Sequence, residues 1–200
     1  MADSLRLLAP LLLILYVGVT FVWRSYRVWR RTGVNPYVLS REDDAEGTIA
    51  RFFRLSMLLL VAVVCVYAVS DRAYNVVAPM GWLERPLWQG FGAALLVLSL
   101  VWIAVAQAQM GNSWRIGIDA REGTALVRRG LFALSRNPIF LGMRVSLLGF
   151  FFMLPNAVTL LTLVLGEVLI QLQVRLEEEF LMKTQGDAYR DYHRQVRRWL

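Results

Sequence analysis

Residues 135–144, which read SRNPIFLGMR, place polar groups at the start of an apolar run. Proline suits the first turn of a helix, because the N–H group that it lacks would have no partner there. Ser135 or Asn137 can cap such a helix, and the free N–H groups of its first turn favour an anionic group. We therefore expect a helix that begins at Pro138 and attracts negative charge at its start.

An acidic cluster, Glu177–Glu179, closes the last apolar run of the chain. Three acids after an apolar helix can simply be solvated, but the helix macrodipole disfavours negative charge at a C-terminal end. A cationic partner removes this objection, and the candidates are Arg128, Arg129, Arg136 or a positively charged ligand. A ligand with a carboxylate and positive charges, such as S-adenosylmethionine, suits both the acidic cluster and the helix start.

Composition limits the class of protein that must position these groups. Hydrophobic residues make up 57% of the 200 residues, and 22 Lys and Arg outnumber 15 Asp and Glu. The basic residues lie between apolar runs, which fits the positive-inside rule better than a nucleic-acid-binding face. Cys65 and His193 are the only cysteine and histidine, so no disulfide framework and no thiol or histidine metal cluster is possible. We expect an integral membrane protein with no metal and no nucleic-acid partner.

Hydropathy predicts an all-α, polytopic protein with five membrane spans, since a helix of about 20 apolar residues crosses a bilayer core. Only Leu154–Asn156 separates the last two spans, which predicts a tight helical hairpin. Arg144 and Glu167 lie at similar distances from this turn on adjacent helices, so we expect them to pair. The predicted spans are Leu7–Trp23, Leu55–Val69, Leu87–Ala108, Ile139–Met153 and Ala157–Val174.

The basic loops predict the orientation of the chain. Residues 24–54 hold seven arginines and four acids, and residues 109–137 hold five arginines and two acids. Both loops therefore belong in the cytoplasm, with the N-terminus outside and the C-terminal tail inside. We interpret the arginines of residues 24–31 as orientation signals and lipid-headgroup contacts.

The C-terminal tail predicts an amphipathic helix. Tyr189, Tyr192, Val196 and Trp199 recur at three- and four-residue spacing on an otherwise charged segment. This apolar stripe either lies on the lipid headgroups or covers a pocket that faces the cytosol. The two readings are compatible with each other.

Two stretches of the sequence resemble one family. Residues 130–142 (GLFALSRNPIFLG) are similar to the G-x-Y-x-x-x-R-H-P-x-Y-x-G motif of isoprenylcysteine carboxyl methyltransferases and related phospholipid methyltransferases. Residues 177–199 are similar to the E-E-x-x-L-x-x-x-F-G-x-x-Y-x-x-Y-x-x-x-V-x-R-W ending of that family. The resemblance covers about residues 109–200, which implies a methyltransferase core there after an N-terminal unit, residues 1–108, of three spans and a cytosolic loop.

The resemblance implies a cytosol-facing pocket that binds S-adenosylmethionine and releases S-adenosylhomocysteine. It also implies a lipid-borne acceptor that enters from the bilayer, and it assigns catalytic roles to Asn137, Glu177 and Glu178. Gln173 and Arg144 are the expected acceptor contacts, and Trp114 lies in a segment near the pocket. The implied cofactor-binding residues are Gln109, Gly111, Thr124, Ala125, Leu126, Val127, Phe132, Arg136, Asn137, Pro138, Ile139, Phe140, Glu177 and Glu178.

Four positions depart from the family pattern. Asn137 replaces a histidine and cannot act as a base at neutral pH, while Phe132 and Phe140 replace tyrosines. Gln173 stands where carboxyl-methylating members carry an arginine, the natural clamp for an acceptor carboxylate. Carboxyl O-methylation of isoprenylcysteine is the family-type reaction, and phospholipid N-methylation is the alternative. An NADPH-dependent membrane reductase and a non-catalytic relative are further alternatives.

Overall fold

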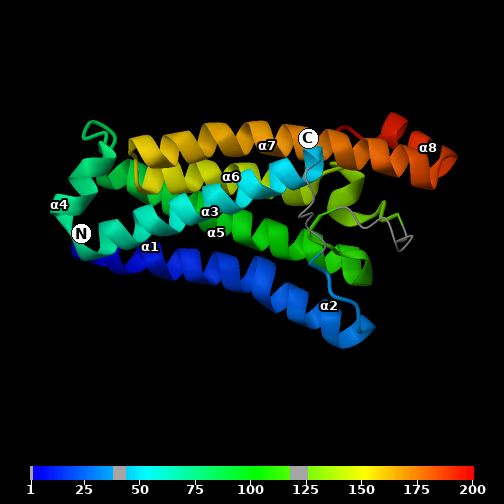
Figure 1. Cartoon of the computed structure of the whole chain (residues 1–200), viewed down its shortest axis with the longest axis horizontal. Helices are drawn as coiled ribbons and strands as arrows, with labels where there is room; N and C mark the ends of the chain where they lie inside the picture. Colours follow the sequence, from blue (N-terminus) through cyan, green and yellow to red (C-terminus); the bar gives the residue numbers. More distant parts are fainter. Residues whose placement is uncertain (1, 38–43, 118–125) are drawn as a thin grey trace.

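The computed structural model describes residues 2–37, 44–117 and 126–200. Within these ranges the chain forms helices and turns, and the β-type pairings are two isolated bridges, Tyr37 with Ile116 and Pro79 with Asn156. The long helices pack lengthwise into one bundle (Figure 1). In chain order the elements are α1 (Ala2–Val17), the π-helix η1 (Gly18–Trp23), α2 (Arg24–Thr32), α3 (Ala45–Val69), α4 (Asp71–Tyr74), η2 (Asn75–Val77), α5 (Pro86–Met110), η3 (Gly111–Ser113), η4 (Gly130–Ala133), α6 (Pro138–Met153), α7 (Ala157–Gln185) and α8 (Asp187–Gln195).

Four described helices are long and apolar enough to cross a membrane. The first is the continuous helix Ser4–Thr32, which comprises α1, η1 and α2, and the other three are α3, α5 and α7. Helix α6 is also apolar but has 16 residues, fewer than the roughly 20 that a perpendicular span needs. Large hydrophobic side chains such as Leu58, Leu98 and Leu161 remain exposed along the bundle, as contact with lipid requires. The chain is therefore an integral membrane protein, and the count of five spans stays a prediction.

Two helices in the first half of the chain extend beyond the predicted spans, and α7 also continues past the predicted Val174 to Gln185. The first continues past Trp23 to Thr32, and α3 begins at Ala45, ten residues before the predicted Leu55. Asp44 fixes the start of α3, because its carboxylate accepts a hydrogen bond from Gly47 N at 2.7 Å. Hydropathy detects only the apolar part of a helix, so both polar extensions escaped it.

Helix α6 packs against both α5 and α7, and α3 packs against α7 and α1. Glycines allow the close approach of α5 and α6, as small residues do at membrane helix contacts. A Cβ atom on Gly92 would lie 2.4 Å from the backbone nitrogen of Met153, and one on Gly142 would lie 2.4 Å from Ile103 Cγ1. These contacts hold α6, and therefore the polar segment before it, in a fixed place beside α5.

Residues 154–156 connect α6 to α7, and Asn156 caps the second helix. Its Oδ1 accepts hydrogen bonds from the backbone nitrogens of Val158 and Thr159, each at 3.0 Å. Farther along the two helices, Arg144 Nε donates to Glu167 Oε2 at 2.7 Å, so the predicted pairing of these two residues is confirmed. The Arg144 guanidinium also lies 4.4 Å from the ring centroid of Trp199, which joins the tail to this pair.

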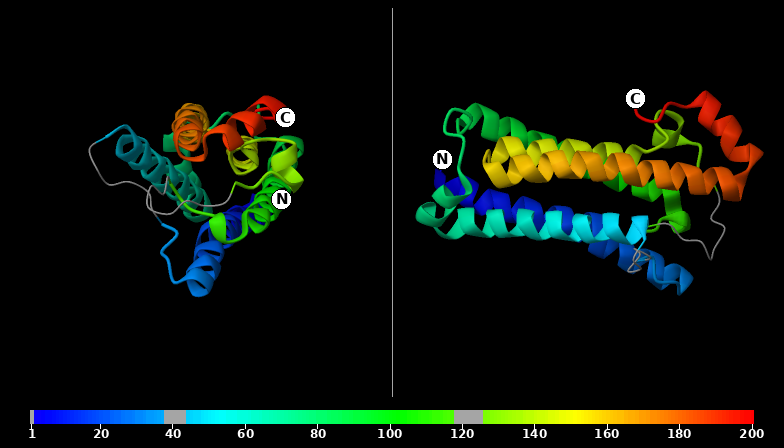
Figure 2. Two further views of the ribbon diagram at one scale, coloured as in Figure 1. Left: turned by 90° about the vertical axis from the view of Figure 1, so that its right-hand side faces the viewer. Right: turned by 45° about the horizontal axis from the view of Figure 1, so that its top comes forward.

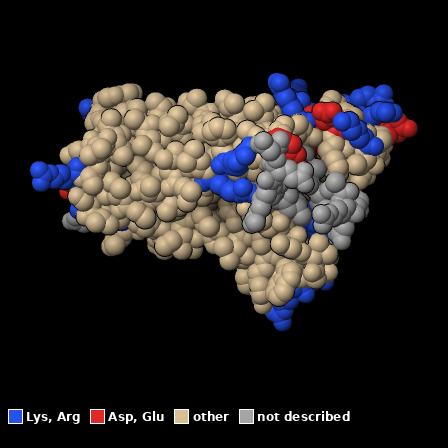
Figure 3. All heavy atoms as spheres, viewed as in Figure 1, with Lys and Arg blue, Asp and Glu red and all other residues tan. Residues whose placement is uncertain are grey.

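The chemistry-bearing segments meet at one end of the bundle. Helices α2 and α8 and the segments after α5 lie at this end, and the turn between α6 and α7 lies at the other (Figures 1 and 2). After α7 the chain turns back on itself through α8 (Figure 2). On the face shown in Figure 3, most charged side chains gather at the α8 end, beside a long surface almost without charge.

Candidate functional site

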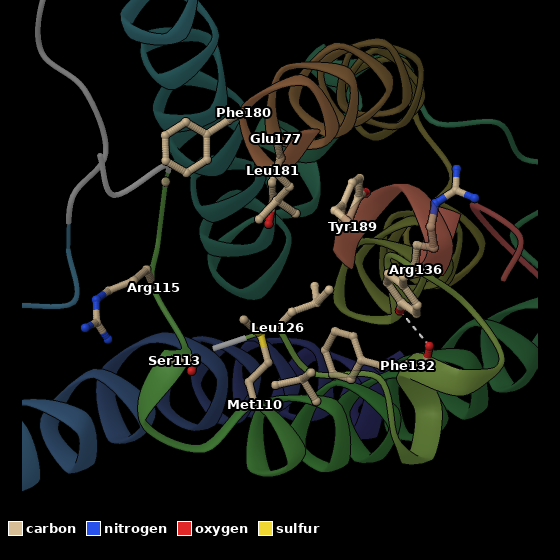
Figure 4. Close-up of a pocket in the computed structure, with 13 residues that line it drawn as sticks. Met110, Ser113, Arg115, Leu126, Phe132, Arg136, Glu177, Phe180, Leu181 and Tyr189 are labelled. Atoms are coloured by element: carbon tan, nitrogen blue, oxygen red, sulfur yellow. Dashed lines mark hydrogen bonds between the residues drawn. The ribbon is translucent and has the colours of Figure 1, made fainter. Parts of the chain in front are cut away.

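A pocket lies at the α8 end of the bundle, between α7 and α8 on one side and the end of α5 with η4 on the other (Figure 4). Its empty space, with the open mouth included, amounts to about 780 Å³. Its lining combines an acid, aromatic rings and apolar side chains. The lining residues are Met110, Ser113, Arg115, Gly117, Leu126, Val127, Phe132, Arg136, Glu177, Phe180, Leu181, Tyr189 and Tyr192.

Helix α7 places one carboxylate in this pocket. Glu177, Phe180 and Leu181 line it together, because positions three and four apart share one face of a helix. Figure 4 shows Glu177 and Leu181 directed from α7 toward the pocket. Glu177 has no hydrogen-bond partner among the described residues, and the negative charges of Glu178 and Glu46 act on it. Glu177 is therefore the acid in the pocket lining that a cationic ligand could pair with.

Glu178, the next residue, does not line the pocket and is buried between two arginines. Its Oε1 lies 3.0 Å from Arg136 Nη2, and its Oε2 lies 2.7 Å from Arg198 Nη2. The hydrogen bond from Arg198 to Glu178 raises the pKa of that guanidinium above its ordinary value. The predicted cationic partner of the acidic cluster is thus Arg136, and Arg198 joins it from the C-terminal tail. We call Glu178, Arg136 and Arg198 the ion cluster.

Asn137 belongs to the same buried region. Its Nδ2 lies 3.4 Å from Glu178 Oε1 and 3.5 Å from the carbonyl oxygen of Arg198. It makes no side-chain cap on α6, and Ser135 Oγ accepts from Asn137 N at 3.1 Å. The predicted cap of α6 by either residue is therefore wrong, because Glu178 and the tail engage the Asn137 amide. The anionic group near this helix start is Glu178 itself.

A short helix, η4, supplies the aromatic floor of the pocket. Gln109 Oε1 accepts from Leu131 N at 2.8 Å, and Tyr192 Oη donates to the carbonyl oxygen of Phe132 at 2.6 Å. Gly130 has φ +65°, and a Cβ atom there would lie 2.5 Å from the Gln109 amide, so glycine allows this approach. These bonds fix Phe132 between α5 and α8.

Two tyrosines of α8 complete the aromatic lining. Tyr189 and Tyr192 are almost fully buried, with ring centroids 6.0 Å apart. Burial raises the pKa of Tyr192 to about 12 and also raises the pKa of Tyr189, so both phenols stay neutral at physiological pH. Of the two readings of the tail stripe, this arrangement corresponds to the one in which α8 covers a pocket.

The structure brings five of the predicted cofactor-binding residues together in the pocket lining, which are Leu126, Val127, Phe132, Arg136 and Glu177. Thr124 and Ala125 lie outside the described residues. The other predicted residues do not line the pocket, and their cofactor contacts stay predictions. They are Gln109, Gly111, Asn137, Pro138, Ile139, Phe140 and Glu178, along with Trp114.

The two predicted acceptor contacts also lie outside the pocket lining. Arg144 is engaged by Glu167, as described above. Gln173 is 4% exposed, and its Oε1 has no hydrogen-bond partner within the described part of the chain. Because Gln173 lies four residues before Glu177, the two side chains share one face of α7, with Gln173 deeper in the bundle.

Several lining residues escaped the sequence analysis. Helical spacing from Glu177 could have found Phe180 and Leu181. Met110, Ser113 and Arg115 come from the end of α5 and the chain after it, where no periodic pattern indicates a common face. Among the described residues no group of three or more His, Cys, Asp or Glu side chains could hold a metal ion.

Comparison with known proteins assigns a family. A family model described as phospholipid methyltransferase matches residues 87–188, which are 102 of the 200 residues. The match starts inside α5 and includes η4, α6, α7 and the start of α8. No curated protein matches the chain. Because more than half of the chain fits the model, this integral membrane protein belongs to the phospholipid methyltransferase family.

Proposed function

We propose that the protein transfers a methyl group from S-adenosylmethionine to a lipid-borne or membrane-partitioned acceptor. The observation that carries this proposal is Glu177, a carboxylate without a described hydrogen-bond partner in a pocket lined by aromatic rings. The family assignment supports a membrane methyltransferase in general. The residues that line the pocket support S-adenosylmethionine as the methyl donor.

The pocket residues fit the chemical groups of S-adenosylmethionine. Glu177 suits the methionine ammonium or the sulfonium, since a carboxylate near a second acid favours a cation. Phe132 and Tyr189 offer ring faces for a flat base, and aromatic faces also attract sulfonium charge. When bound, the cofactor supplies an electrophilic methyl group on a positively charged sulfur.

The protein contributes positioning and exclusion of water to such a displacement, and both are large effects when the reacting atoms are held in line. Tyr192 and Gln109 hold Phe132 from two sides. We assign direct cofactor contact to Glu177. Glu178 pairs with Arg136 and accepts from the Asn137 amide, so both Glu178 and Asn137 are engaged within the protein. We therefore assign them positioning roles in place of direct catalysis.

Two acceptor classes remain for this site. Carboxyl O-methylation of isoprenylcysteine is the family-type reaction, and its ionised acceptor needs no base. Phospholipid N-methylation is favoured by one feature, the buried carbonyl oxygen of Gln173, which can accept a hydrogen bond from an amine. Gln173 can also donate to a carboxylate through Nε2, but without the charge of an arginine.

The first experiment measures binding of S-adenosylhomocysteine to detergent-purified protein by calorimetry. We expect wild type to bind and Glu177→Gln to bind at least about tenfold more weakly, because a charged contact is lost. The matched control is Glu179→Gln, which changes the same charge at an exposed position paired with Lys183. Equal affinity of all three proteins would refute the role of Glu177. Binding of NADPH instead would favour the reductase, and binding of neither ligand would favour a non-catalytic relative.

Turnover with labelled cofactor then separates the acceptors. Prenylcysteine and aminophospholipid vesicles are offered to wild type and to Gln173→Arg. If the methyl acceptor is an amine, wild type should methylate the phospholipid. Gln173→Arg should then abolish this activity, since an arginine side chain cannot accept a hydrogen bond from the amine. A carboxylate acceptor predicts activity on prenylcysteine that Gln173→Arg increases.

We also propose that the N-terminus lies outside and the pocket faces the cytosol, since the basic loops lie at the pocket end. Cys65 is first changed to serine, which leaves no other cysteine. Single cysteines at Gly81→Cys, before α5, and Leu200→Cys, in the tail, are then treated with a membrane-impermeant maleimide on intact cells. Labelling at position 81 alone supports this orientation, and labelling at position 200 alone reverses it.

A further inference from the structure

The pocket wall that follows α5 is held in place by the N-terminal helix and the chain after it. A guanidinium N–H of Arg24 donates to the carbonyl oxygen of Gly111. Farther along the wall, Ile116 N donates to the carbonyl oxygen of Pro36 at 2.9 Å, and Tyr37 forms an isolated bridge with Ile116. These N-terminal residues lie outside the part of the chain that matches the family model.

Arg24 differs from the other arginines of its segment. It is 8% exposed, whereas Arg27, Arg30 and Arg31 are exposed on the same helix. Besides the bond to Gly111, its guanidinium lies 5.9 Å from the ring centroid of Trp114, a residue that is itself buried. The predicted role of Arg24 as a lipid-headgroup contact is therefore wrong, because its charged group is directed into the protein.

The backbone immediately before Arg24 is unusual. Gly18–Trp23 form a π-helix, a rare element that is frequent at functional sites. Thr20 in this element is 1% exposed, and its carbonyl oxygen accepts a hydrogen bond from Gln107 Nε2 at 2.8 Å. The first helix thus contacts α5 one turn before the pocket, at Gln107, and again at Gly111.

The two contacts enclose the residues that form the pocket wall. Met110 and Ser113 line the pocket on either side of Gly111. Gly111 ends α5 with φ +59° and ψ −130°, a conformation that is readily available to glycine only. The hydrogen bond to the Gly111 carbonyl oxygen therefore determines the direction in which the chain continues along the pocket after α5 ends.

We infer that Arg24 is a positioning residue of the pocket, which it shapes by anchoring the Gly111–Ser113 turn from the first helix. Arginine suits this role because its planar group can donate to a carbonyl and contact an indole face at once, whereas the lysine ammonium is a compact point charge. The anchoring follows from the contacts alone, and only the identity of the ligand rests on the proposed function.

The test compares Arg24→Gln and Arg24→Lys with Arg27→Gln, which removes the same charge from an exposed position one turn away. Hydrogen exchange of the ligand-free proteins, followed by mass spectrometry, measures the opening of residues 107–117. We expect Arg24→Gln to speed exchange in this segment about tenfold, Arg24→Lys to speed it less, and Arg27→Gln to match wild type. Equal exchange in Arg24→Gln and Arg27→Gln overturns the inference.

Affinity for S-adenosylhomocysteine is measured on the same proteins. We expect the Kd to rise roughly tenfold in Arg24→Gln and to recover partly in Arg24→Lys, while the KM for the acceptor is unchanged. Gly92→Ala, which perturbs the opposite end of the α5–α6 contact, controls for general loss of stability. A Kd that rises equally in Gly92→Ala and Arg24→Gln at equal loss of Tm overturns the inference.

These readouts separate this inference from the proposed function. If wild type does not bind S-adenosylhomocysteine, the proposed cofactor fails while hydrogen exchange still decides the role of Arg24. If wild type binds but the Arg24 variants bind equally well, the inference fails and the cofactor assignment stands. Should Arg24→Gln not fold, the comparison of Arg24→Lys with Arg27→Gln decides in the same way.

Discussion

Replacement of Glu178 by glutamine tests whether the ion cluster holds the pocket end of the bundle together. Glu178 and Arg136 have side chains that are 8% and 7% exposed, so the variant leaves a buried guanidinium without its counter-ion. Loss of one partner from a buried pair costs about 3–5 kcal/mol. Glutamine retains one carbonyl oxygen and Arg198 is 34% exposed, so we expect the lower end, about 3 kcal/mol.

Thermal unfolding of detergent-purified protein, followed by tryptophan fluorescence, measures this loss. For a chain of this size 1 kcal/mol shifts the Tm by about 2–4 °C, so Glu178→Gln should lower it by roughly 6–12 °C. Glu179→Gln removes the same charge from an adjacent but exposed ion pair, and such pairs contribute about 0–1 kcal/mol.

A double-mutant cycle with Arg198→Gln identifies the interaction. Because Glu178 Oε2 and Arg198 Nη2 are 2.7 Å apart, the summed stability losses of the two single variants should exceed the loss of the double variant by about 0.5–3 kcal/mol. Additive losses would show that the two side chains do not interact. A Tm for Glu178→Gln within 2 °C of that for Glu179→Gln, about the shift that 1 kcal/mol produces, would refute the argument as a whole.

Two further predictions concern packing and pH. Gly92→Ala should destabilise the protein by about 1–3 kcal/mol in thermal unfolding, because its Cβ would meet the backbone of Met153, whereas Gly90→Ala, with open space around it, should match wild type. Burial raises the pKa of Tyr192 to about 12, so the folded state disfavours the phenolate, and the contribution of Tyr192 to stability should be constant below pH about 10 and fall between about 10 and 12. Tyr192→Phe should flatten part of this fall, and an unchanged pH profile of Tm would contradict the burial argument.

Local patterns explain what the sequence could predict. Hydropathy identifies membrane helices because each apolar run is contiguous, and the pairing of Arg144 with Glu167 follows from their similar distances to one tight turn. Arg136 was a candidate partner for the acidic cluster because the helix macrodipole disfavours negative charge at a C-terminal end. Each of these inferences depends on one element or on two elements joined by a short connection.

Contacts between distant segments could not be predicted in this way. Arg24 binds Gly111, which is 87 residues away in the sequence. Glu178 binds Arg198 of the tail, which is 20 residues away and follows a turn of the chain. Nothing in the charge pattern of residues 24–31 distinguishes the buried Arg24 from its exposed neighbours. The two acids Glu177 and Glu178 are also equivalent in sequence, although they point about 100° apart on the helix.

The ion cluster explains why two adjacent glutamates serve the pocket in different ways. Arg136 belongs to residues 130–142 and Arg198 to residues 177–199, so the two stretches that carry the family resemblance meet at Glu178. Contacts on one face of α7 fix the rotation of that helix, and Glu177, about 100° away, is then fixed toward the pocket. Because both arginines pair with Glu178, Glu177 is the carboxylate in the pocket lining that stays open to a ligand. A cation in the pocket would therefore bind a carboxylate that its neighbour holds in place, which is the preorganisation that a methyl-transfer site requires.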